Sequence, residues 1–205
     1  MTSEPAQRAV PTVASPARRP LLLCAGAAGL CWVAAGALLL TTPLDPASSV
    51  LASSRVIYYV LVIAAALLTF VPIQRLLCTP GLALEGVAGA ALVCYAVAFV
   101  PPPTAPIYAL PELPVYAIMI GALFVVGSAI ALPFVVLLGR RLFQRRARQY
   151  DLRRARRQAH EVGAFVAGCG VLAGMQILTP IAAILVALTL VVVETLFLAY
   201  VEAVP

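Results

Sequence analysis

The sequence predicts an all-α integral membrane protein that folds as a bundle of six transmembrane helices. Three observations predict this class. Of the 205 residues, 63% are hydrophobic, and the mean hydropathy is +1.03. Charged residues make up 11% of the chain, against roughly 25% in a typical soluble domain. Six apolar stretches are each long enough, as helices, to cross a hydrocarbon layer about 30 Å thick.

The elements follow in order from the amino terminus. Residues 1–19 contain three prolines and three arginines without an apolar period, so we expect a disordered cytoplasmic tail. The first apolar stretch is too long for a cleaved signal peptide, and we expect it to remain in the protein. Residues 20–201 form the membrane domain, and residues 202–205 form a C-terminal tail. The predicted spans are 21–40, 56–73, 82–100, 115–139, 162–178 and 181–201.

The placement of the arginines predicts the orientation. If the amino terminus is inside, thirteen of the fourteen arginines lie in the tail and the inner loops, and Arg55 alone lies outside. The positive-inside rule therefore predicts that both termini are cytoplasmic. The chain has no lysine or asparagine and is rich in Ala, Pro and Arg, which we interpret as bacterial codon usage. We expect the bacterial plasma membrane. The proline-rich outer loop, residues 101–114, is either a rigid connector or a docking surface.

Residues 140–161 form an arginine-rich cytoplasmic loop between the fourth and fifth spans. The loop has no proline or glycine, which predicts helix. Guanidinium groups bind both phosphate and carboxylate, so anionic lipid headgroups and an acidic partner protein both remain open as ligands. No nucleic-acid-binding motif accompanies the charge, and nucleic acid is not an expected partner. The nine arginines are Arg140, Arg141, Arg145, Arg146, Arg148, Arg153, Arg154, Arg156 and Arg157.

Rows of small residues predict two helix-packing faces, because small side chains allow close approach of another helix. Each face contacts either another helix of the same bundle or another subunit, and the sequence does not decide between these two contacts. The fifth span carries one row and the first span the other: Gly163, Ala167, Gly170 and Gly174, and Gly26, Gly29 and Gly36.

Two glutamates fall within predicted spans. Glu85 lies near the inner end of the third span, where the helix dipole favours a negative charge. Glu194 lies in the sixth span, about 10 Å from its inner end. A charge at this depth costs a few kcal/mol unless it is paired, hydrated or protonated. The two glutamates can share a proton or a cation, or Glu194 can pair with Arg140 or Arg141.

Catalytic chemistry is not expected. His160 is the only histidine, and its sequence context lacks the second histidine of a zinc-peptidase motif. We expect no cofactor and no metal. The leading hypothesis is a non-enzymatic subunit or accessory of a larger bacterial membrane complex that contacts anionic lipid or an acidic partner. The alternative is a small transporter or permease component that uses Glu194, with Glu85, as a proton or cation site.

Overall fold

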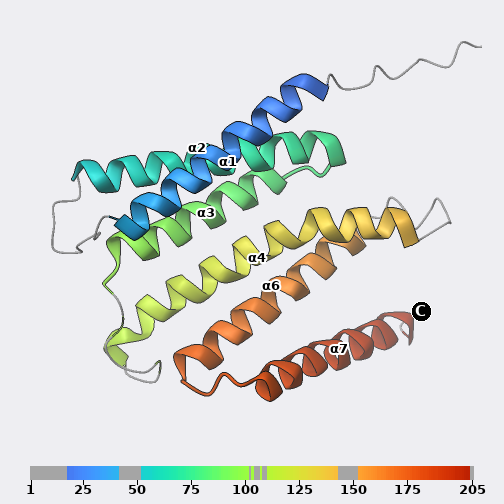
Figure 1. Ribbon diagram of the computed structural model, residues 1–205. Helices are drawn as coiled ribbons and strands as arrows, with labels where there is room; N and C mark the ends of the chain where they lie inside the picture. The colour runs from blue at the N-terminus through green and yellow to red at the C-terminus, as the bar shows by residue number, and fades with distance from the viewer. Residues whose placement is uncertain are drawn as a thin grey trace, which may run out of the picture.

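The structure is a computed structural model that describes residues 18–41, 52–101, 103, 107, 110–142 and 152–203. Within these ranges the regular secondary structure is helical throughout (Figure 1). Most of the predicted N-terminal tail and the middle of the arginine-rich loop lie outside the described residues. The elements are α1 (Arg18–Thr41), α2 (Ser53–Leu77), α3 (Leu82–Phe99), the short 3-10 helix η1 (Leu110–Glu112), α4 (Leu113–Leu142), α6 (Leu152–Gly174) and α7 (Pro180–Ala203).

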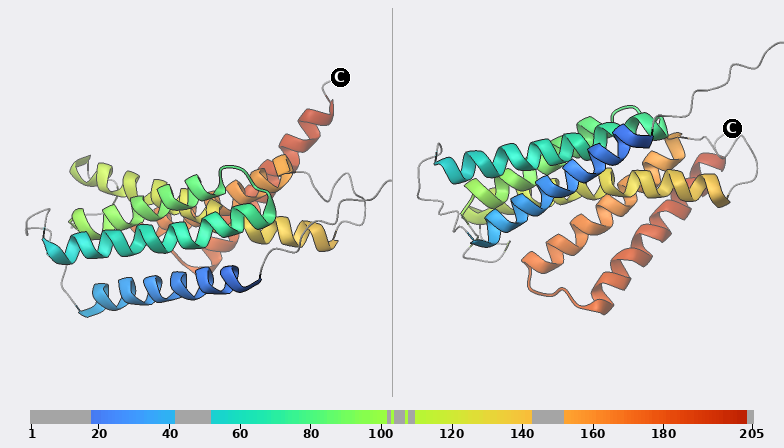
Figure 2. Two further views of the ribbon diagram at one scale, coloured as in Figure 1. Left: turned by 90° about the horizontal axis from the view of Figure 1, so that it is seen from above. Right: turned by 45° about the horizontal axis from the view of Figure 1, so that its top comes forward.

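The long helices pack side by side as one open row (Figures 1 and 2). Successive helices run in opposite directions, and each one contacts its neighbour in the sequence. The interface between α4 and α6 is the most extensive, and the interface between α6 and α7 is much smaller. Within the described ranges, α6 is the only helix whose backbone lies next to that of α7. The row therefore leaves α1 and α7 with one helical neighbour each.

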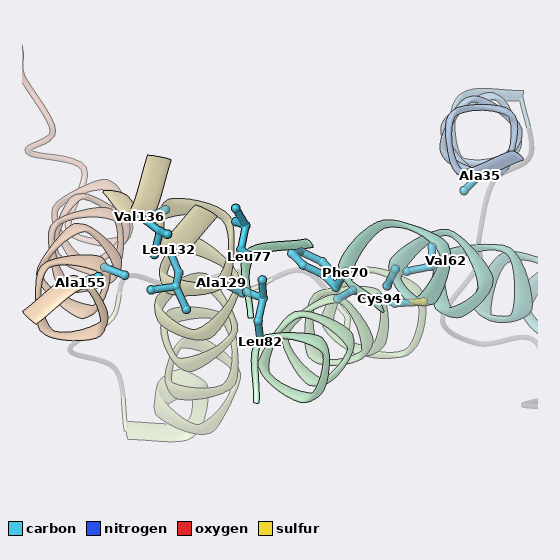
Figure 3. Close-up of a cluster of buried hydrophobic side chains, with 14 of the residues drawn as sticks. Ala35, Val62, Phe70, Leu77, Leu82, Cys94, Ala129, Leu132, Val136 and Ala155 are labelled. Atoms are coloured by element: carbon cyan, nitrogen blue, oxygen red, sulfur yellow. The ribbon is translucent and has the colours of Figure 1, made fainter. Parts of the chain in front are cut away.

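Small side chains and a few large ones make the core of the row. Ala65 and Ala66 of α2 are fully buried, and Phe70, one turn further, lies against Gly86 of α3. A methyl group on Gly86 would overlap the Phe70 ring, so the ring takes the space that this glycine leaves. Figure 3 shows that the buried side chains continue through the row to α4 and α6.

Five of the predicted spans are confirmed as helices long and apolar enough to cross a membrane. Their agreement with the sequence reflects long apolar stretches that few charges interrupt. The helix boundaries differ by a few residues, and α2 begins early enough to include Arg55, which is buried beside the Phe99 ring. The five helical segments are Pro20–Thr41, Ser53–Leu77, Leu82–Phe99, Leu113–Arg141 and Pro180–Phe197.

The predicted fifth span, residues 162–178, is not among the helices that meet this condition. The helix α6 begins at Leu152, within the predicted loop, and ends at Gly174. Its apolar part, 162–174, has a length of roughly 20 Å, which is less than the roughly 30 Å of a hydrocarbon layer. Gln176 takes a left-handed conformation (φ 61°), and the Ile177 N–H donates to the Leu172 carbonyl at 3.0 Å. This C-cap ends the helix.

The small-residue row of α6 faces α4. A methyl group on Gly163 would lie 2.6 Å from the Phe124 carbonyl oxygen and would also overlap the Ser128 hydroxyl. One on Gly170 would lie 2.8 Å from Leu123, and Gly174 faces the Tyr116 ring. The row, with Ala167 buried in it, is therefore used for packing within the chain.

The predicted row on α1 is placed differently. A methyl group on Gly26, Gly29 or Gly36 would meet no described atom within 4 Å outside its own helix. The buried residues of α1 are instead Ala28 and Ala35. Each directly precedes a glycine of the row and therefore lies about 100° around the helix from it. The glycines of α1 therefore lie on the outer surface of the row of helices.

We expect Gly163→Ala to lower the free energy of unfolding in detergent by about 1–3 kcal/mol, because the added methyl group meets the backbone of α4. Gly121→Ala, on α4, is the matched control, since a methyl group there meets nothing within 4 Å. The control should be neutral or slightly stabilising through helix propensity. Equal stabilities of the two variants would contradict the close contact.

Candidate functional site: a charged network along α6

The first half of α6 is a polar helix held against an apolar neighbour. Ala155, Ala159 and Gly163 are spaced four residues apart and are buried, which places this face against α4. Arg156 and Arg157 follow Ala155 directly. Because successive helical residues are about 100° apart, the two arginines leave the α4 face on different sides of α6. One reaches α3, and the other reaches α7.

Arg156 joins α6 to the turn before α3. Its guanidinium lies 3.3 Å from the Glu85 carboxylate and donates a hydrogen bond to the Pro80 carbonyl at 2.6 Å. Glu85 lies in the first turn of α3, where the helix dipole also stabilises its charge. Arg140 of α4 acts in the same region, because it donates to the Leu77 carbonyl at 2.9 Å near the end of α2. Both arginines thus bind backbone oxygens that flank the α2–α3 turn.

Arg157 joins α6 to α7. Its Nη2 atom lies 2.6 Å from Oε1 of Glu194, and its guanidinium lies 5.8 Å from the centre of the Phe197 ring. The side chain of Glu194 is 21% exposed and that of Arg157 is 39% exposed. Glu161, one turn along α6, lies 3.9 Å from Arg157. One guanidinium therefore faces two carboxyl groups.

Glu161 and Glu194 interact directly as well. The pKa of the Glu161 carboxyl is raised from 4.5 to about 7, mainly by burial and then by the side chain and negative charge of Glu194, while the positive charge of Arg157 lowers it. Two ionised carboxylates repel each other, so a proton on Glu161 stabilises the pair while Glu194 keeps its ion pair with Arg157. The arrangement can bind and release one proton.

The structure does not bring the two predicted acidic site residues together. Glu85 and Glu194 pair with different arginines, and their helices α3 and α7 make no backbone contact in the described part of the chain. The partner of Glu194 is Arg157, whereas Arg140 binds a carbonyl of α2. Glu161, the second carboxyl, was not predicted as a site residue. Its spacing of four residues from Arg157 indicated an ion pair but carried no sign of α7.

The nine predicted arginines have different environments. Arg140, Arg156 and Arg157 bind groups of this chain. Arg141 and Arg153 are exposed, and Arg154 is half-buried. The remaining three lie outside the described residues: Arg145, Arg146 and Arg148.

The donor set does not point to a metal. Among the described ranges, no group of three His, Cys, Asp or Glu side chains has the geometry to hold an ion. Comparison of the chain with protein-family models, with curated proteins and with solved structures gave no match.

The raised pKa of Glu161 predicts a pH dependence. The folded protein holds the proton up to about pH 7, whereas the unfolded chain releases it near 4.5. The contribution of Glu161 to the free energy of unfolding is fully present below pH 4.5 and is lost as the pH rises through about 7. We expect the wild type to unfold in detergent more readily at pH 8 than at pH 5, and Glu161→Gln to weaken this difference. Glu112→Gln, in η1, is the control that should retain it. A wild type with the same stability at both pH values would contradict the shared proton.

Proposed function

We propose that this chain is a non-enzymatic subunit of a larger membrane assembly and that α7 is the helix that contacts its partner. The observation that supports this is the isolation of α7. In the part of the chain that the structure describes, none of the residues in Pro180–Phe197 is buried. Lipid can cover such a surface, but the way in which α7 is attached favours a protein contact.

The attachment is a charge pair rather than an extensive packed interface. Moving an arginine and a glutamate into a region of low dielectric offsets much of their attraction, so such pairs add little stability. Their best-attested use is to fix the register of one helix against another. Arg157 and Glu194 set the height and the rotation of α7 on α6. A helix that buries so little needs a fixed rotation when its other face must meet a defined surface.

The location that we propose is the bacterial plasma membrane, with both termini in the cytoplasm. The alternating directions of the helices support it (Figure 1). The start of α1, the ends of α2 and α4 and the start of α6 lie at the same end of the row, and these segments carry basic residues. The exposed Arg141 and Arg153 are available there to anionic headgroups or to an acidic partner.

The outer face of α7 provides the test. Leu188 is 55% exposed and lies about 200° around the helix from Val186, which packs on Gly168. We expect protein taken from its native membrane in mild detergent to carry a stoichiometric partner, and Leu188→Trp to lose it through overpacking. Leu84→Trp, at a 75% exposed leucine of α3, should keep it. A wild-type particle that contains one 21.4 kDa chain and no other polypeptide would refute the proposal.

A second candidate is a proton-translocating component, and the shared proton of Glu161 and Glu194 favours it. The Arg157 guanidinium already neutralises Glu194, so the site suits a proton better than a metal cation. Glu85 lies apart from it, on Arg156.

Liposomes with an imposed pH gradient test this candidate. We expect the reconstituted wild type to dissipate the gradient faster than empty liposomes. Glu194→Gln should remove the difference, because an amide cannot relay the proton. Glu85→Gln, at the other ion pair of α6, is the matched control and should conduct as the wild type does. A wild type no faster than empty liposomes leaves the subunit as the only candidate.

A further inference from the structure

A cleft of about 530 Å³ lies between α4, α6 and α7. It exists because α7 stands off from the row, and within the described ranges its backbone lies next to that of α6 alone. Val135 and Leu138 of α4 form one wall, and Ala187 and Leu190 of α7 form the other. The floor is a strip of α6.

The floor changes from polar to apolar along its length. Arg154, Gln158 and Glu161 follow one another at spacings of four and three residues, so they share one face of α6. Val162 and Phe165 continue that face in the direction of the apolar half. The distance along the axis from Arg154 to Phe165 is about 16 Å. The cleft is thus polar at its basic end and apolar over the rest.

We propose that this cleft binds one anionic phospholipid, with an acyl chain between α4 and α7 and the phosphate at Arg154. The proposal is independent of the partner of α7. Guanidinium groups bind phosphate through two parallel hydrogen bonds, and basic pockets between membrane helices are known binding sites for anionic headgroups. Arg141 and Arg153, exposed near the same end, add positive charge.

The volume favours a lipid chain over an inserted helix. A helix with its side chains is 10–12 Å across and occupies roughly 400–600 Å³ in each turn. The cleft therefore has room for about one turn, whereas a helix that crosses the membrane has about 20 residues. Its volume does fall in the range of roughly 300–1,000 Å³ in which small molecules bind. A flexible chain can fill such a space without moving α7.

Gly139 offers a way to fill the cleft without disturbing the fold. It lies on the cleft wall, and a methyl group there would meet nothing within 4 Å. Gly139→Leu should therefore place its side chain where the acyl chain lies. Gly121→Leu is the matched control, because it changes the same residue type on the same helix, also faces open space and is not part of the cleft.

The probe is a bilayer nanodisc with equal amounts of phosphatidylglycerol and phosphatidylcholine. After gentle extraction, native mass spectrometry counts the phospholipids retained by each chain. We expect one retained phosphatidylglycerol on the wild type and on Gly121→Leu, and at least a tenfold loss on Gly139→Leu. Arg154→Gln should reduce the preference for phosphatidylglycerol about fivefold, which corresponds to the roughly 1 kcal/mol of one arginine near anionic lipid. Arg75→Gln, at an exposed arginine in the last turn of α2 and outside the cleft, should leave the preference unchanged.

Three outcomes would overturn the proposal. The first is a wild type that retains no phospholipid. The second is equal retention by the two glycine variants, or equal preference in the two arginine variants, because binding would then be a general surface effect. The third uses a photoreactive residue at Leu138, which lines the cleft. If this residue cross-links to a polypeptide in the native membrane, and not to phospholipid, a protein occupies the cleft.

Discussion

The fold depends on how the chain neutralises the carboxylates that it places in apolar helices. Glu85 and Glu194 belong to helices whose backbones make no contact in the described part of the chain, and α6 supplies an arginine to each of them. Because Arg156 and Arg157 are adjacent, their reach fixes both the rotation and the height of α6 in the row. The close contact of Gly163 with Ser128 and Phe124 fixes the same position from the α4 side. The two ion pairs and the close packing at Gly163 therefore specify the same position of α6.

This position explains why α6 differs from the other long helices. Its basic half must lie beside Glu85 of α3 and Glu194 of α7, so apolar residues cannot replace it. The apolar half that remains ends at Gly174, where Gln176 caps the helix. The helix after it, α7, begins at Pro180 and returns beside α6 with little packing. Among the described residues, this short, charged helix is the one neighbour of α7, and this arrangement opens the cleft and leaves the outer face of α7 exposed.

Much of the fold was predictable from the sequence, and the features that were not predicted have physical causes. Five spans were correct because each is a long apolar stretch, and the row from Gly163 to Gly174 follows directly from helical spacing. The span at 162–178 is not confirmed, because the helix there ends at Gly174, and apolar length alone does not show where a C-cap will end a helix. Arg157 was missed as the partner of Glu194 because it lies on a different helix. Spacing along one helix cannot reveal a contact between two helices.

The two ion pairs of α6 are not equivalent, and charge counting shows why. Arg156 faces one carboxylate, so its pair with Glu85 is neutral, and the Pro80 carbonyl holds it further in place. Arg157 faces Glu161 and Glu194, so this group carries an excess negative charge unless one carboxyl is protonated. The α3–α6 connection is therefore complete without a proton, whereas the α6–α7 connection is strongest with one. Any influence of pH on this part of the molecule acts through α7, the helix with the fewest other contacts.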